Sequence, residues 1–458
     1  MNTADNATSQ ANGASATQFD AVVVGAGFGG MYMLHKLREL GFTAKVYEAG
    51  GNVGGTWYWN RYPGARCDVP SLQYSYQFSE ELQQEWHWTE RYSTQPEILR
   101  YANHVADRFD LRKDIQFNTR VTRAAFDEST NTWTVETDAG DRVTATFCIM
   151  ASGCLSSKNT PNFPGLADFQ GQWFHTGNWP HEGVDFAGKR VGVVGTGSTG
   201  IQAIPMIARE AEHLVVFQRT PQYSVPARNA PLDPAEEARI KADYKGYRAK
   251  NNAQPFAQDL TPPTVTTFEV SEEERRRRYE ECWEKGGLGM MLAYADSGTN
   301  LTANQTVSNF VKEKIQVVVK NPVVAEHLLP DHVYACKRPC LDTDYFETYN
   351  RPNVTLVDLR GTGIERITSH GVQANGTEYP VDCLVFATGF DAMTGALNNI
   401  DIRGKENQAL KDKWVEGPRC YLGLASAGFP NFFIITGPGS PSVLANMIPA
   451  IEQHVNWI

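Results

Sequence analysis

Two glycine-rich motifs carry the clearest chemical signal in the sequence. The glycines are Gly25, Gly27 and Gly30 in the first motif, and Gly195, Gly197 and Gly200 in the second. In this spacing the first glycine permits a tight turn, the second lets the backbone approach a pyrophosphate, and the third lets a helix pack closely on a strand. The phosphate then binds at the helix N-terminus. We therefore expect two dinucleotide sites in one chain.

A residue downstream of each motif indicates which dinucleotide each site would bind. Glu48 stands 23 positions after Gly25, and Arg219 stands 24 positions after Gly195. A carboxylate accepts hydrogen bonds from ribose hydroxyls and repels a 2′-phosphate, so Glu48 favours FAD or NAD. Arg219, with Thr220 beside it, favours the 2′-phosphate of NADPH. The simpler alternative is that Arg219 is only a surface cation at a strand end.

A flavin and a nicotinamide in one chain imply hydride transfer to the flavin and delivery of two electrons to an acceptor. A disulfide acceptor would require a redox-active cysteine pair, but none of the eight cysteines forms C-x-x-C, so buried, apolar roles are the simpler interpretation. The ten histidines show no metal-binding spacing, so we expect no metal. Dioxygen or a quinone remains as the acceptor.

Each glycine motif lies between a predicted strand and a predicted helix. Val22 to Val24 form an apolar strand, and Met31, Leu34, Leu37 and Leu40 recur along a helix that Gly41 ends. Residues 44–47 form the next strand. The second unit repeats this order, with strands at 191–194 and 214–217. Both units are βαβ folds.

The wider chain fits an α/β protein with two Rossmann-like dinucleotide-binding domains. We expect a polar tail over residues 1–17, a discontinuous FAD domain over 18–155 and 385–458, and an NADPH domain over 165–384. The linker SSKNTPNFPG separates the two units. A charged, helical insertion occupies about 230–330; its four successive arginines are flanked by glutamates, which favours a solvated helix face over a polyanion site.

Composition and charge narrow the function further. The 458 residues carry a net charge of −10, with 41% hydrophobic and 21% charged residues, which is typical of a globular protein. We find no basic field for nucleic acid, no apolar run of 18 residues and no secretory signal. We therefore expect a cytoplasmic protein that acts as a monomer or weak oligomer, without nucleic-acid or membrane partners.

A third motif lies just before the second glycine turn. The segment FQGQWFHTGNWP fits F-x-G-x-x-x-H-x-x-x-W-P at Phe169, Gly171, His175, Trp179 and Pro180. In this it resembles the Baeyer–Villiger monooxygenases. GGTWYWNRYPGARCD, FQRTPQYSVPARNAPLD and GPGSPSVLANM are similar to the phenylacetone and steroid monooxygenase group in particular, and the resemblance runs from Phe19 to the last residue.

The resemblance implies a fold like that of glutathione-reductase-like flavoproteins and a reaction in which NADPH, O2 and a ketone give an ester or lactone via a C4a-peroxyflavin. It implies that Arg338 supports the developing oxyanions and holds the nicotinamide, that Asp68 orients Arg338, and that Lys337 helps Arg219 to hold the 2′-phosphate. A guanidinium stays charged at any working pH and suits that role.

Further site residues follow from the same resemblance. The remaining FAD contacts would be Gly55, Thr56, Trp57, Asp68, Tyr74, Val121 and Met447. The remaining NADPH contacts would be Thr196, Ser198 and Thr199. Ser442, Val443 and Leu444 would form the wall of the substrate pocket, although core packing also suits the last two.

Two expectations concern segments rather than single contacts. For His175 and Trp179 we favour a structural or hinge role over direct catalysis, because the motif lies in a linker between domains. Ser440 or Ser442 could cap the helix that follows, with Pro441 in its first turn. The chain ends at EQHVNWI, with Ile448, Ile451 and Val455 still in helical phase, whereas relatives continue; we expect a C-terminal truncation that affects NADPH affinity and turnover.

Two rival functions stay open. An N- or S-oxygenating flavin monooxygenase would share both nucleotide sites, although the W-P ending argues against it. A nucleotide-binding but turnover-deficient protein is the second rival.

Overall fold

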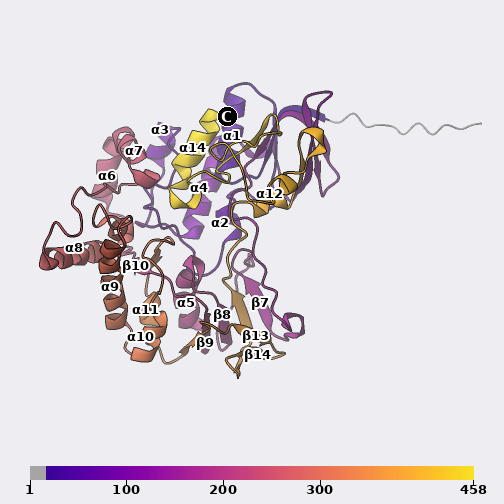
Figure 1. Cartoon of the computed structure of the whole chain (residues 1–458). Helices are drawn as coiled ribbons and strands as arrows, with labels where there is room; N and C mark the ends of the chain where they lie inside the picture. Colours follow the sequence, from indigo (N-terminus) through magenta and orange to yellow (C-terminus); the bar gives the residue numbers. More distant parts are fainter. Residues whose placement is uncertain (1–16) are drawn as a thin grey trace, which may run out of the picture.

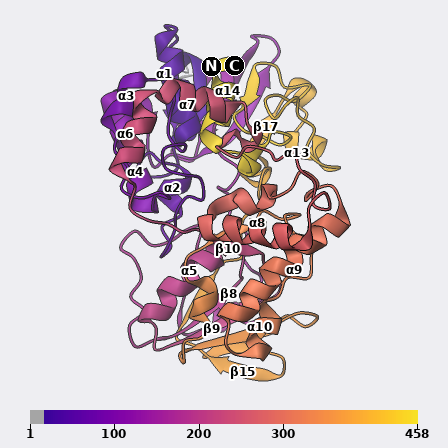
Figure 2. The same ribbon diagram turned by 90° about the vertical axis from the view of Figure 1, so that its left-hand side faces the viewer.

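The computed structural model describes residues 17–458, which form two lobes, each built on a β-sheet (Figure 1). Residues 1–16 of the tail expected at 1–17 lie outside the described residues, and Thr17 already belongs to the first strand. Both ends of the described chain, in indigo and yellow, lie in one lobe (Figure 2). The bounds of the expected discontinuous domain stay a prediction.

An eight-stranded sheet forms the core of the first lobe. Its strands are β1 (Thr17–Val24), β2 (Ala44–Tyr47), β3 (Ile115–Gln116), β4 (Val121–Asp127), β5 (Thr132–Thr137), β6 (Arg142–Met150), β17 (Asp401–Arg403) and β18 (Phe432–Ile434). The order is β17-β4-β5-β6-β1-β2-β3, and β18 pairs with the end of β6. β1 runs parallel to both β2 and β6, while β4, β5 and β6 form an antiparallel meander.

Helices cover this sheet. They are α1 (Phe28–Glu39), α2 (Thr56–Trp59), α3 (Glu80–Glu85), α4 (Gln95–Arg108), α12 (Gly395–Asn398), α13 (Leu410–Lys413) and α14 (Met447–Trp457). The last helix packs beside α1, although the two are more than 400 residues apart. The predicted apolar face of α1 holds at Met31, Leu34 and Leu37, but Leu40 is 67% exposed because the helix ends before it.

A parallel five-stranded sheet forms the second lobe, in the order β12-β9-β8-β16-β7. The strands are β7 (Gln172–His175), β8 (Arg190–Val194), β9 (His213–Gln218), β12 (Val354–Asp358) and β16 (Cys383–Phe386). Val385 and Phe386 pair with β8, so this sheet extends past the expected boundary at residue 384. Smaller sheets flank it: β10 (Ser224–Pro226) with β11 (Cys340–Asp342), and β13 (Ile364–Ile367), β14 (Gly371–Ala374) and β15 (Thr377–Pro380).

The expected helical insertion divides between the lobes. It contains α6 (Pro234–Ala242), α7 (Tyr244–Asn252), α8 (Glu272–Lys285), α9 (Leu301–Val318) and α10 (Pro322–Leu328); α5 (Ser198–Glu210) and α11 (Tyr345–Thr348) lie outside it. Ile240 and Tyr244 pack into the core of the first lobe, whereas Tyr279 and Phe310 pack into that of the second. On α8, Arg276 and Arg277 are exposed and paired with glutamates, as the solvated-face interpretation predicts.

Candidate active site

The first glycine motif forms the turn between β1 and α1. Gly25 has a φ of +105°, and a Cβ atom there would lie 2.6 Å from the Ala151 carbonyl oxygen. A Cβ at Gly30 would lie 1.8 Å from the Gly25 oxygen. No side chain caps α1, whose N-cap is Gly27. The first backbone N–H groups of the helix are therefore free for a phosphate.

Glu48 lies at the end of β2 and is 5% exposed. Its Oε2 accepts a hydrogen bond from the Ala26 N–H, and its Oε1 accepts one from the Gly50 N–H, both at 2.7 Å. Burial raises the pKa of Glu48, while these two backbone donors oppose the rise. Each carboxylate oxygen keeps a second acceptor site for a ribose hydroxyl.

A cavity runs along this turn. The residues predicted for FAD that line it are Gly25, Gly27, Glu48, Gly55, Thr56, Trp57, Tyr74, Val121 and Met447. Inside, the Trp57 Nε1–H donates to the Tyr74 hydroxyl over 3.1 Å. Gly30 acts through packing and does not line the cavity, and Asp68 lines a second cavity instead. The cavity fits FAD because glycines leave its wall open at the turn: a Cβ at Gly27 would lie only 3.3 Å from the Gly55 Cα across the wall.

Sequence reasoning missed part of the cavity wall. Thr119, Arg120, Ala151, Ser152, Gly153, Cys154, Asn399, Ile400, Ile435 and Thr436 also line it. The available signal was the small-residue run IMASG at the end of β6, because β6 lies next to β1 in the sheet. The residues that follow β6 must therefore lie beside the glycine turn.

The second glycine motif repeats this construction between β8 and α5. Gly195 has a φ of +108°, and its Cβ would lie 2.5 Å from the Ala387 oxygen, just as Gly25 faces Ala151. A Cβ at Gly200 would lie 2.3 Å from the Gly195 oxygen. At Gly197 an added Cβ meets no atom within 4 Å. The approach to this turn is open, and α5 has no side-chain cap.

The other residues predicted for NADPH surround this turn. The Thr196 hydroxyl donates to the Thr220 carbonyl over 3.2 Å, and the Ser198 hydroxyl lies 3.2 Å from the Cys340 sulfur. Arg219 follows β9 and is exposed, as is Lys337. Neither cation forms an ion pair within residues 17–458. Two unneutralised cations and an open glycine turn fit a dinucleotide that carries an extra phosphate.

Arg338 and Asp68 meet although 270 positions separate them. Arg338 Nη2 lies 3.0 Å from Asp68 Oδ1, and Nη1 donates to the Val443 carbonyl. The Arg338 Nε–H is buried and has no hydrogen-bond partner among the described residues. A buried donor without a partner is costly, so this atom is available for a ligand.

The residues predicted for the substrate wall lie beside Arg338. Ser442 is buried and has a φ of +45°, which is strained for serine, whereas Val443 and Leu444 are exposed. The exposure argues against core packing for these two. The expected serine cap is wrong: the Asn446 side chain accepts from the Ile448 N–H and caps α14, because a short 3-10 turn over residues 442–444 delays the helix.

The third motif packs within the second lobe, where its strand β7 pairs with β16. Phe169 and Trp179 belong to hydrophobic cores, and a Cβ at Gly171 would lie 2.3 Å from the Asp382 oxygen. His175 is 2% exposed and ends β7, whereas Pro180, which follows Trp179, is only half-buried. No residue of the motif lines the first cavity.

His175 connects the two crossing segments, by which we mean the chain around Asn159 and the chain around Thr388, where it passes between the lobes. Its Nδ1 accepts from the Gly177 N–H over 3.0 Å, so Nε2 carries the proton toward the Thr388 hydroxyl, 3.2 Å away. That hydroxyl donates to the Asn159 carbonyl over 2.9 Å. Burial lowers the pKa of His175, which favours the neutral ring. This geometry supports the structural role.

Other possible sites have less support. Within residues 17–458 no group of three or more His, Cys, Asp or Glu side chains is placed to hold a metal, and no helix there has the length and apolarity to cross a membrane. All eight cysteines are free; most are buried or half-buried, but Cys336 is exposed, contrary to the buried interpretation.

Comparisons with known proteins identify the family of the chain. The family model of flavin-binding monooxygenase-like (FMO-like) proteins matches residues 19–229. The chain is 46% identical to a "Baeyer-Villiger monooxygenase" of Pseudooceanicola batsensis, over 96% of this chain and 81% of the relative. This chain belongs to the Baeyer–Villiger monooxygenase family.

Two further relatives have comparable sequence identity to this chain. The structure of an "oxidized steroid monooxygenase bound to NADP" is 55% identical, with a TM-score of 0.93 over 96% of this chain and 84% of that one. "Phenazine N-monooxygenase PhzNO1" of Lysobacter antibioticus is 44% identical over 96% of this chain and 82% of the relative. The predicted α/β fold with two Rossmann-like units, the flavin-dependent monooxygenase class and the FAD and NADPH cofactors are confirmed.

Proposed function

We propose that the chain converts ketones to esters or lactones, with one oxygen atom of O2 entering the product and the other leaving as water while NADPH becomes NADP⁺. The observation that carries the proposal is the Arg338–Asp68 pair, in which the buried Arg338 Nε–H lacks a partner in the part of the chain that the structure describes. A cation in such a position stabilises an oxyanion that develops on a reacting carbonyl. The cofactors, when bound, supply the hydride and the activation of O2.

The chain's own residues then divide the work. Arg338 holds the negative oxygens of the reacting groups and contacts the nicotinamide, and Asp68 keeps the guanidinium oriented and its charge balanced. The first glycine turn and Glu48 bind the adenosine and pyrophosphate of FAD. Arg219 and Lys337 bind the 2′-phosphate of NADPH. Ser442, Val443 and Leu444 border the ketone.

The remaining expectations extend this proposal. The enzyme acts in the cytoplasm as a monomer or weak oligomer. His175 and Trp179 hold the crossings between the lobes and do not touch the reactants, which the packing of the motif supports.

The test is the product of an aerobic reaction. FAD-loaded protein is incubated with NADPH and a panel of linear, cyclic and arylaliphatic ketones, and the products are identified by mass spectrometry. Phenylacetone should give benzyl acetate. No ester or lactone from any ketone would overturn the proposal, and NADPH-dependent flavin reduction without any oxygenated product would favour the turnover-deficient rival.

N-oxygenation is the second candidate, because the phenazine N-monooxygenase is nearly as similar as the ketone-type relative. The same incubation therefore includes phenazine and an aryl sulfide. An N-oxide or sulfoxide with every ketone inert would establish this candidate instead.

A further inference from the structure

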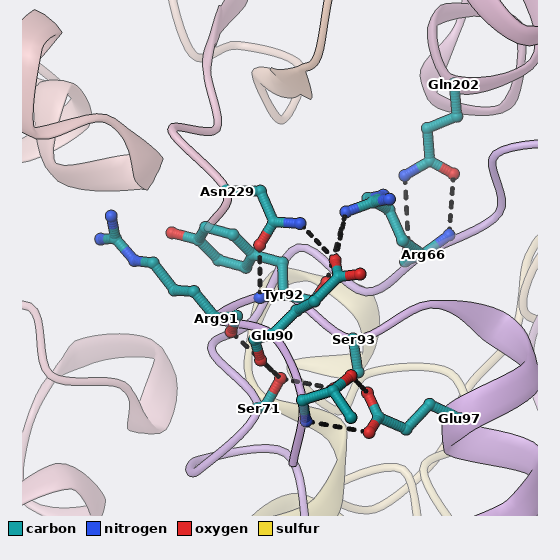
Figure 3. A network of polar contacts seen from close by, with 10 residues as sticks. Arg66, Ser71, Glu90, Arg91, Tyr92, Ser93, Glu97, Gln202 and Asn229 are labelled. Carbon is teal, nitrogen blue, oxygen red and sulfur yellow. Dashed lines mark hydrogen bonds and ion pairs between the residues drawn. The ribbon is translucent and has the colours of Figure 1, made fainter. Parts of the chain in front are cut away.

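The segment that carries Asp68 is bound to the second lobe by a side-chain amide. We call residues 62–94 the strap; they connect α2 to α4 of the first lobe. Gln202, on the second turn of α5, donates from Nε2 to the Arg66 carbonyl over 3.1 Å. Its Oε1 lies 3.4 Å from the Arg66 backbone nitrogen (Figure 3). The same oxygen accepts from the Tyr62 hydroxyl at 2.8 Å.

A second amide repeats this arrangement on the other side of the strap. Asn229 follows β10, and its Oδ1 accepts from the Tyr92 N–H over 2.9 Å while its Nδ2 donates to Glu90 at 2.5 Å (Figure 3). Glu90 also pairs with the Arg66 side chain at 3.1 Å. The Arg66–Glu90 ion pair therefore links the residue that Gln202 binds to the residue that Asn229 binds.

Gly64 shows how closely the strap approaches α5. A Cβ there would lie 2.3 Å from the Gln202 carbonyl oxygen, and φ is +82°. The strap backbone thus lies directly on the helix, with no room for a side chain between them. The strap and α5 therefore form a closely packed backbone contact at Gly64.

The same lobe also holds Arg338. Arg338 precedes β11, which pairs in parallel with β10, and Asn229 follows β10. Asp68 is two residues from Arg66. Both members of the Arg338–Asp68 pair are therefore attached to the lobe with the second glycine turn, although the sequence places Asp68 between elements of the first lobe.

We propose that Gln202 and Asn229 are positioning residues that hold Asp68 against Arg338, so that the guanidinium and its carboxylate stay paired beside the second glycine turn. Neither amide touches the reacting atoms. Their effect on the reaction passes through Asp68. This inference rests on the proposed function for its activity readout.

The test compares Gln202→Ala and Asn229→Ala with Arg209→Ala. Arg209 lies farther along α5, and its substitution removes an exposed ion pair to Asp344 and a contact with the Met206 sulfur. The first readout needs no turnover: hydrogen–deuterium exchange of the strap peptides should rise in the two amide variants and stay unchanged in the control. Unchanged exchange in both amide variants would overturn the proposal.

The second readout is the ester formed per NADPH consumed. Gln202→Ala should lower this ratio on the order of tenfold, since a small misplacement of a catalytic group costs that much or more. In an Asp68→Asn background the same substitution should have no further effect, because interacting residues are not additive. Additive losses would show that Gln202 acts elsewhere and would contradict the proposal.

Two controls keep the outcomes separate. Flavin content and thermal unfolding identify a variant that fails to fold; if Gln202→Ala does, Tyr62→Phe, which removes only the hydroxyl bonded to Gln202, takes its place in both readouts. The wild-type protein is assayed in parallel. Absence of ester from the wild type counts against the proposed function, whereas normal exchange in the variants counts against the positioning role.

Discussion

At the scale of single residues, Arg338 makes the sharpest prediction. Arg338→Ala should abolish ester formation yet leave FAD bound, because Arg338 does not line the first cavity. Product analysis checks the loss of ester, and flavin absorbance of the purified variant checks that FAD stays bound. Substantial ester from the alanine variant would remove Arg338 from its role.

Arg219 should decide the choice of coenzyme. Arg219→Ala should weaken NADPH binding about tenfold to a hundredfold and leave NADH binding nearly unchanged, because only NADPH carries the phosphate that a charged hydrogen bond would hold. Titration of the variant with both coenzymes measures this difference. An equal loss for both would support the simpler alternative of a surface cation.

The residues found from the sequence are those whose partners are local. Glu48 and Arg219 were predicted because a βαβ unit fixes the distance from its glycine turn to the end of its second strand. The Arg338–Asp68 contact could be expected only from resemblance, since no local spacing relates residues so far apart. Gln202 and Asn229 gave no signal at all, because an amide that binds backbone has no motif.

Among the structural elements, the second glycine turn allows NADPH binding to be tested separately from folding. Gly197→Ala should leave folding and FAD content unchanged, because its Cβ would meet no protein atom and its φ is −79°. The methyl group would instead obstruct the pyrophosphate, so NADPH binding should fall sharply in a titration. Gly30→Ala is the matched contrast: its Cβ would lie 1.8 Å from the Gly25 oxygen, so loss of FAD and of stability is expected.

Helix α14 should make stability depend on pH. Glu452 is buried there, and burial raises its pKa to about 7 although its oxygen accepts from the Gln77 and Phe78 N–H groups. The unfolded chain ionises this group near pH 4.5, so its contribution to stability is complete below that pH and is lost as the pH rises toward 7. The difference corresponds to about 3 kcal/mol.

Thermal unfolding between pH 5 and 8 tests this expectation. The wild type should lose stability relative to Glu452→Gln across that range, because the amide keeps the hydrogen bonds and cannot ionise. A constant difference between the two proteins over the whole range would contradict the assignment to Glu452.

Element-level predictions failed where tertiary contacts override local pattern. The serine cap was expected because serine favours that position, but residues 442–444 form a short 3-10 turn, so α14 begins later with Asn446 as its cap. The insertion was expected as one unit, yet α6 and α7 belong to the first lobe because Ile240 and Tyr244 fill its core. Neither outcome can be seen in hydrophobic period or capping preference alone.

At the scale of the whole molecule, two similar glycine turns sit in different lobes, and each faces an alanine carbonyl at the start of a crossing segment. The crossing segments are joined by the hydrogen bonds from His175 to Thr388 and from Thr388 to Asn159. The strap adds a further connection through Gln202. Arg338, which precedes β11 of the second lobe, adds a contact to the first lobe because its Nη1 donates to the Val443 carbonyl.

We propose that this arrangement of residues inserts one atom of O2 beside a ketone carbonyl. An incubation of the FAD-loaded protein with NADPH, phenylacetone and ¹⁸O₂, followed by mass spectrometry of the product, tests this reaction. Benzyl acetate that carries one ¹⁸O atom is expected, with NADPH consumed in proportion. NADPH consumption without ester, or ester without the label, would contradict it.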